Sequence, residues 1–126
     1  MARKKSVTLT DGELRVMDVL WRLGSATVAE IQQELARHDL AYTTVLTTVQ
    51  VLETKGYVTH ASQGRAYVYK PKAPREKTVK KALRHFVTRW FDGSPNELLL
   101  NVIEEHDLDP DEVSELMRVL RRKAKK

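Results

Sequence analysis

The sequence of 126 residues contains no cysteine, which excludes disulfide bonds, thiolate metal sites and cysteine nucleophiles. Long apolar runs are also absent. The longest, residues 66–69, has four residues, whereas a membrane-spanning helix needs about 20. No apolar stretch follows the basic N-terminal residues, as it would in a secretory signal. These absences exclude a membrane protein and a secreted disulfide-rich domain, and we expect a cytoplasmic protein.

Motifs for catalysis and for metal or cofactor binding are absent as well. The four histidines lie about 20 or more residues apart, and no pair has the H-E-x-x-H spacing of a zinc site. No serine lies in a G-x-S-x-G context, and no glycine-rich phosphate loop occurs. Helix capping and a solvated face explain the carboxylates between residues 104 and 112 better than cation binding does. We therefore expect no catalytic residue, no metal and no cofactor, and the protein is not expected to be an enzyme.

The charge is unevenly distributed along the chain. The net charge is +5 and the pI is near 9.6, which favours a polyanionic partner. Residues 91–117 contain nine acidic side chains and no lysine or arginine, whereas five of the last six residues are basic. Because an acidic segment makes a poor nucleic-acid surface, the N-terminal part is the better candidate for binding DNA.

Helix signals are clear in the first half of the chain. Residues 10–13 and 27–30 each form a capping box, in which a threonine hydroxyl and a glutamate carboxylate satisfy free amides of the first turn. A further helix is predicted over residues 41–55, because apolar side chains recur at helical spacing and Gly56 ends the pattern. The sequence thus predicts three successive helices.

A β-hairpin is predicted to follow these helices. Residues 57–61 and 66–69 are rich in β-forming side chains, and residues 62–65 join them with Gly64 at the bend. The segment 23–27 can supply a third strand. Three helices followed by a hairpin are typical of a winged helix-turn-helix domain, which we expect over residues 1–73.

The remaining residues, 74–126, are predicted to form three helices and a dimerisation region. The fold class is therefore mainly α with a small β-hairpin. One of the three helices is apolar nearly all round at residues 98–103, so it must be covered on several sides. Because a unit of about 50 residues is only marginally stable alone, we expect a homodimer. The side chains expected at its interface are Val79, Leu83, Val87, Trp90, Leu99, Val102, Ile103, Leu116 and Leu120.

The second helix of a helix-turn-helix pair lies in the major groove, and here that helix is residues 41–55. It has no lysine or arginine between residues 42 and 54, but threonine and leucine methyls can contact thymine and glutamine can pair with adenine. Electrostatic affinity would come from the arm Arg3-Lys4-Lys5, from Lys55 and from Arg65, which suits a minor groove. The expected base contacts are Thr43, Leu46, Thr47 and Gln50, and the expected backbone contacts are Tyr42, Thr44, Lys55 and Arg65.

Several of these residues have a second interpretation. Thr44 could be a partly buried packing residue, and the role of Tyr42 stays open between phosphate contact and packing. We expect packing roles for Tyr69 and core positions for Trp21 and Trp90, which lie on apolar stripes. The alternative function for the whole chain is a winged-helix protein-interaction module without sequence-specific DNA binding, which the uncharged helix and the acidic segment would suit.

Four groups of motifs, spread from Leu9 to about Lys123, carry a family resemblance. They are Leu9-Thr10-Asp11-Gly12-Glu13 with Val19-Leu20-Trp21; Tyr42-Thr43-Thr44-Val45-Leu46-Thr47-Thr48-Val49 with Leu52 and Lys55-Gly56; Gly64-Arg65-Ala66-Tyr67-Val68-Tyr69-Lys70-Pro71; and Leu100-Asn101 with Asp107-Leu108. Through these motifs the sequence resembles the penicillinase/methicillin-resistance repressor family of bacteria, BlaI/MecI, to which the CopY copper repressors are related. The resemblance implies a homodimeric transcriptional repressor that binds a palindromic operator and regulates antibiotic resistance.

The resemblance also implies how repression ends. In the family a membrane sensor protease responds to β-lactam, and the repressor is cut in its dimerisation region, commonly between an asparagine and a phenylalanine. The matching position is Asn101-Val102, where valine stands in place of phenylalanine. The copper-responsive relatives carry a cysteine motif near the C-terminus. Because this chain has no cysteine, copper sensing through thiolates is excluded.

Overall fold

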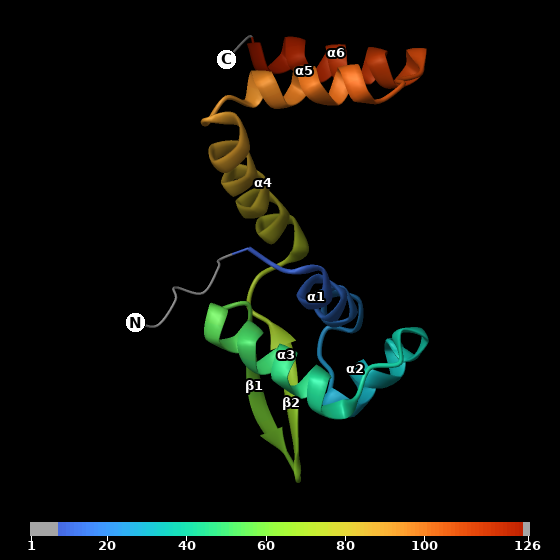
Figure 1. The fold of residues 1–126 in the computed structure, drawn as a ribbon, viewed down its shortest axis with the longest axis vertical. Helices are drawn as coiled ribbons and strands as arrows, with labels where there is room; N and C mark the ends of the chain where they lie inside the picture. Colours follow the sequence, from blue (N-terminus) through green and yellow to red (C-terminus); the bar gives the residue numbers. More distant parts are fainter. Residues whose placement is uncertain (1–7, 125–126) are drawn as a thin grey trace. The chain divides into compact units, whose positions relative to one another are not determined.

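The structure, a computed structural model, describes residues 8–124 and is mainly α-helical with one two-stranded sheet (Figure 1). It divides into two compact units, the first ending at Ala82 and the second beginning at Leu83. No helix in the described range is long and apolar enough to cross a membrane. The elements are α1 (Asp11–Leu23), α2 (Val28–Glu34), the short 3₁₀ helix η1 (Ala36–His38), α3 (Tyr42–Lys55), β1 (Val58–Gln63), β2 (Ala66–Pro71), α4 (Arg75–Phe91), α5 (Pro95–Glu105) and α6 (Pro110–Ala124).

Both predicted capping boxes are present. The Thr10 hydroxyl accepts from the Glu13 amide at 3.1 Å, and the Glu13 carboxylate accepts from the Thr10 amide at 2.9 Å. Thr27 and Glu30 form the same pair of bonds at 3.2 and 2.9 Å. These bonds satisfy amides that have no partner within the helix, and they fix where α1 and α2 begin.

The core of the first unit lies between its three helices and the sheet. Helix α3 turns Val45, Val49 and Leu52 inward, and each is fully buried. They share one apolar cluster with residues of α1, α2 and both strands, so α3 is held by packing although its threonines and valines are weak helix formers. The other members of this cluster are Val16, Met17, Val19, Leu20, Ala26, Val28, Ile31, Leu35, Val58 and Tyr69.

The hairpin is longer than the sequence predicts. Ser62 and Gln63, expected in the loop, instead pair with Tyr67 and Ala66, so only two residues form the turn. Gly64 has φ +64° there, a left-handed conformation that a two-residue hairpin turn demands and that glycine adopts without strain. The strands therefore extend almost to the tip of the wing.

The predicted third strand is reduced to a single β-bridge between Ala26 and Tyr69, whose amides and carbonyls exchange bonds of 2.8 and 2.9 Å. The bridge does not lengthen, because the next amides that would face β2 are those of residues 24 and 28. The Gly24 amide donates to the Leu20 carbonyl at the end of α1, and Val28 already begins α2. Tyr69 is 2% exposed, which confirms its predicted packing role.

The second unit keeps most of its apolar side chains on its surface. Among its described residues only Val87 is buried, at 8% exposure. Trp90, expected in the core, is 67% exposed; this prediction is wrong for the single chain. Trp21 of the first unit, also expected in the core, is partly buried against the core cluster. A helix stripe is buried only where another element covers it, and no other element within residues 8–124 covers Trp90.

Candidate nucleic-acid interface

Helix α3 presents an uncharged, hydrogen-bonding strip on the side opposite its buried face. Thr43, Thr44, Thr47 and Gln50 are exposed, and Tyr42 at the start of the helix is 49% exposed. Leu46 lies differently, because it is half-buried and packs against the core cluster. The structure thus brings the predicted threonines and glutamine together on one face, with Leu46 at its edge.

The role predicted for Lys55 is wrong. It was expected to contact the DNA backbone, but its side chain is only 7% exposed and its Nζ lies 2.8 Å from Glu13 Oε1. The same ammonium donates to the Thr8 carbonyl at 3.1 Å. Because its charge is engaged inside the protein, Lys55 is a structural residue of the first unit and is not available to phosphate.

The ion pair with Lys55 affects the pKa of Glu13. Burial raises the pKa of Glu13, but the hydrogen bonds from Lys55 and Thr10, together with the positive charge of Lys55, outweigh burial and hold the pKa below its ordinary value of 4.5. The carboxylate is therefore ionised near neutral pH, and it balances the buried ammonium. The sequence offers no direct sign of this pair, because its members lie 42 positions apart.

Arg65 lies at the tip of the wing. It follows Gly64 in the hairpin turn and is exposed, and Figure 1 shows the hairpin extending beyond the helices of its unit. A guanidinium in this position can enter a minor groove. The arm Arg3-Lys4-Lys5, the other expected source of positive charge, lies outside the described residues.

A second group of side chains joins the wing to the end of α3. His60 Nδ1 lies 2.6 and 2.8 Å from the two carboxylate oxygens of Glu53, and its ring lies 4.6 Å from that of Tyr67 and 5.5 Å from that of Tyr69. Burial, then Glu53, Tyr67 and Tyr42, raise the pKa of Tyr69. The sequence analysis missed this cluster, although strand register could have indicated it, since His60 stands directly opposite Tyr69.

The residues expected at a dimer interface lie on α4, α5 and α6, and eight of the nine are exposed. Val79, Leu83, Trp90, Leu99, Val102, Ile103, Leu116 and Leu120 are between 40 and 67% exposed, whereas Val87 is already buried within its own chain. Phe86, Leu100, Val113 and Met117, which we had not included, are exposed to a similar degree. Exposed apolar side chains in this number are typical of proteins that bind a partner through them.

The expected cleavage position lies inside α5. Asn101 and Val102 are both exposed, and the Asn101 side-chain amide donates to the Glu97 carbonyl at 2.8 Å. The bond thus lies within a regular helix and not at a loop tip, where proteolytic cutting is commonest.

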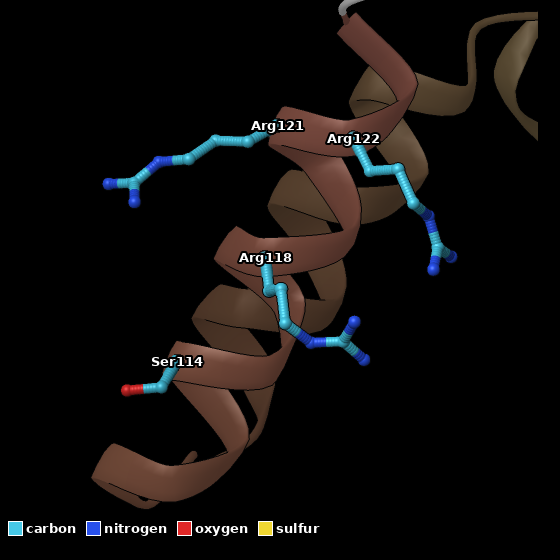
Figure 2. Close-up of a pocket in the computed structure, with 4 residues that line it drawn as sticks. All are labelled: Ser114, Arg118, Arg121 and Arg122. Atoms are coloured by element: carbon cyan, nitrogen blue, oxygen red, sulfur yellow. The ribbon is translucent and has the colours of Figure 1, made fainter.

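A hollow of about 450 Å³ lies along α6. Three arginines and Ser114 line it, but the guanidinium groups diverge, with Arg121 and Arg122 extending to opposite sides of the helix (Figure 2). Arg118 is paired with Glu115. Diverging cations do not form an anion site, and residues 8–124 contain no group of three potential metal ligands.

Comparison with known proteins shows which family the chain resembles. The chain matches the penicillinase repressor family over residues 9–122. It is 30% identical over 118 residues to the penicillinase repressor of Bacillus licheniformis, covering 93% of this chain and 92% of that protein. It is 36% identical over 119 residues to the transcriptional regulator BlaI of Mycobacterium tuberculosis, covering 92% of this chain and 85% of the relative.

A solved structure matches the first part of the molecule. The DNA-binding domain of the repressor BlaI is 32% identical, with a TM-score of 0.51, and the match covers 58% of this chain and 90% of that domain. The winged helix-turn-helix fold expected from the sequence is thereby confirmed. With the family match extending through both units, the chain belongs to the penicillinase repressor family.

Proposed function

We propose that this protein is a transcriptional repressor that binds a palindromic operator as a homodimer. The observation that carries the proposal is the family match across residues 9–122 together with the exposed polar strip of α3 beside a wing ending in Arg65. The protein-interaction module considered as an alternative is not favoured, because the first unit matches a DNA-binding domain at 32% identity. The family consists of repressors and not of enzymes.

In this proposal α3 reads bases and its surroundings hold the DNA backbone. Thr43, Thr47 and Gln50 face the major groove, where methyl and amide groups can distinguish thymine and adenine. Tyr42 and Thr44 lie at the first turn of α3, where a phenol and a hydroxyl can bond to phosphate. Because α3 carries no cation apart from the buried Lys55, the electrostatic part of the affinity comes from Arg65 and other basic residues outside the helix.

The homodimer is proposed to form through residues 74–126. The support is the apolar surface of α4, α5 and α6, where Leu99, Ile103 and Leu120 are each about half exposed. A second copy would bury these side chains, and burying apolar surface is the main driving force of stable association. Two joined DNA-binding units would then meet major grooves about one helical turn apart and occlude a promoter.

Release from the operator is proposed to follow loss of the dimer. The family resemblance implies a membrane sensor protease and a cut at Asn101-Val102. A cut at this position suits loss of the dimer, because Val102 is among the residues expected at the interface and the apolar residues Leu100 and Ile103 flank the bond on α5. A cut there would separate α6 from α4 and leave two monomers, each with a single DNA-binding unit.

Fluorescence anisotropy tests the function directly. The full chain is titrated into duplexes from the region upstream of its own gene and into scrambled duplexes, at two salt concentrations. We expect a dissociation constant near 10⁻⁸ M or tighter for the operator, at least about 10³-fold tighter than for the scrambled duplex. Equal and strongly salt-sensitive binding to every duplex would contradict the proposal.

A further inference from the structure

We infer that Glu53 of α3 and His60 of β1 are a pair of positioning residues that fix the direction of the wing, so that Arg65 at its tip meets DNA in a set relation to α3. This role rests on the proposed function and deepens it, because the DNA contact of Arg65 then depends on two residues away from the tip. All three residues belong to the first unit, which ends at Ala82.

The wing is packed into its unit at its base. There Val58 and Tyr69 are buried, and Tyr69 forms the β-bridge with Ala26. Farther out, every residue of β1 from 60 to 63 is exposed. A two-stranded hairpin has little stability of its own without packing. The outer half of the wing therefore needs a further contact if its tip is to keep one direction.

Small rotations at the base are amplified at the tip of the wing, which extends beyond the helices of its unit (Figure 1). Gly64 follows Val58 by six residues, which is about 20 Å at the rise of a β-strand. A rotation of about 10° at the base moves the tip by about 3.5 Å, more than the length of a hydrogen bond. Arg65, the other residue of the turn, therefore reaches a constant point in the groove only if the direction of the hairpin is fixed.

The bond between Glu53 and His60 supplies such a contact. His60 Nδ1 lies 2.8 Å from Glu53 Oε1 and 2.6 Å from Glu53 Oε2. Because a carboxylate only accepts hydrogen bonds, Nδ1 carries a proton and donates it to this bond. Glu53 lies in the last turn of α3, and His60 is the third residue of β1. The bond thus joins the end of α3 to the wing at a point outside the buried base.

The imidazole ring extends this restraint toward the tip. Side chains alternate between the two faces of a strand, so the register places His60, Tyr67 and Tyr69 on the same face of the hairpin. The centre of the His60 ring lies 5.5 Å from that of the buried Tyr69 and 4.6 Å from that of the exposed Tyr67. Tyr67 is two residues from Arg65. The His60 ring therefore contacts both the base and the outer half of β2.

A stabilising role does not account for Glu53. It is the single acidic residue of α3, and a carboxylate on a helix that reads DNA repels the phosphates. The side chains of Glu53 and His60 are each about one-third exposed, and ion pairs with this much exposure contribute little to stability. A contact that opposes DNA binding electrostatically and adds little stability is explained by the geometry that it gives to the wing.

The consequence is an energetic coupling between the pair and Arg65. If the pair fixes the wing, the affinity that Arg65 contributes depends on the pair, and removing both has less effect than the sum of the two separate losses. If His60 contacted DNA by itself, its effect would instead add to that of Arg65. Additivity therefore separates a positioning role from a direct contact.

The experiment measures the contribution of Arg65 in several backgrounds, with the full chain and an operator that the wild type selects from random duplexes. Fluorescence anisotropy gives the loss of affinity caused by Arg65→Ala in the wild type, in Glu53→Leu and in Glu53→Gln. Both changes at position 53 remove the same charge, but only glutamine keeps an oxygen that accepts from His60 Nδ1. The two variants are therefore a matched pair for the hydrogen bond.

We expect Arg65→Ala to weaken operator binding about tenfold in the wild type and in Glu53→Gln, and less than about threefold in Glu53→Leu. Arg65→Ala should also reduce the salt dependence of binding less in Glu53→Leu than in Glu53→Gln. His60→Phe keeps an aromatic ring beside the two tyrosines and removes the donor, so it should behave like Glu53→Leu. It tests the same bond from the wing if Glu53→Leu fails to fold.

The outcomes separate this role from the proposed function. If the wild type selects no operator, the proposed function fails and the positioning role fails with it. If the wild type selects an operator and Arg65→Ala has the same effect in every background, the positioning role alone is overturned. It is also overturned if Glu53→Leu and Glu53→Gln reduce the contribution of Arg65 equally, because the hydrogen bond would then not be its cause.

Discussion

Lys55 at the end of α3 and Glu13 in the first turn of α1 form an ion pair of 2.8 Å in which both side chains are less than one-tenth exposed. The pair joins the last turn of the candidate recognition helix to the capping box of α1, since the same Glu13 carboxylate accepts from the Thr10 amide. The position of α3 in the first unit therefore depends on a buried charge pair as well as on apolar packing.

Replacing Lys55 with methionine should destabilise the protein strongly. Removal of one partner leaves the buried Glu13 carboxylate without its cation, a change that costs about 3–5 kcal/mol in unfolding free energy. Urea unfolding measures this cost. Arg22→Gln, which breaks an exposed pair with Glu34, should cost less than about 1 kcal/mol. Equal costs for the two variants would contradict the structural role of Lys55.

The contribution of Glu13 should depend on pH. Because the folded protein holds the pKa of Glu13 below its ordinary value of 4.5, the unfolded chain binds the proton more readily. Stability from this residue is therefore fully present above pH 4.5 and is lost as the pH falls through the lower, folded-state pKa. The difference in unfolding free energy between wild type and Glu13→Gln should shrink over that acidic range. A difference that stays constant with pH would exclude the mechanism.

Arg65→Ala should weaken operator binding and reduce its salt dependence. Two copies of Arg65 in a dimer neutralise two phosphates, so the slope of log K against log salt should become less steep by about 1.8. Anisotropy titrations at several salt concentrations give this slope. Arg65→Lys keeps the charge and should retain the wild-type slope. An unchanged slope in Arg65→Ala would remove Arg65 from the interface.

Ile103→Asp should produce a monomer. Ile103 is 53% exposed on α5 in the single chain, and an aspartate buried against a second copy would carry an unpaired charge. Light scattering at micromolar concentration should give twice the chain mass for the wild type and the chain mass for the variant. Operator affinity should fall at least about tenfold, because the two DNA-binding units are no longer joined.

Glu104→Gln is the control for this prediction. It changes the charge at the neighbouring exposed position without altering apolar surface, and it should remain dimeric. A wild-type chain that scatters as a monomer would contradict the proposed dimer altogether.

Much of the fold could be predicted because its signals are local. A capping box such as Thr10 with Glu13 is a contact between residues three positions apart, and the bend of the hairpin at Gly64 depends on backbone conformations that glycine favours. The inward face of α3 follows from helical periodicity alone, and Val45, Val49 and Leu52 are buried as expected. The error in the hairpin, where Ser62 and Gln63 extend the strand, arose because polar residues can pair in a strand as well as in a turn.

The sequence by itself thus determined the order of the elements and the family, since helix starts, turns and motifs are properties of short segments. Only the tertiary structure decided that Lys55 is buried against Glu13, that His60 meets Glu53 and that Trp21 holds the carbonyl of Ala73. Members of the first and last pairs lie 42 and 52 positions apart, and whether they meet depends on how α1, α3 and the hairpin pack together. That packing is set by the whole core, and no local pattern specifies it.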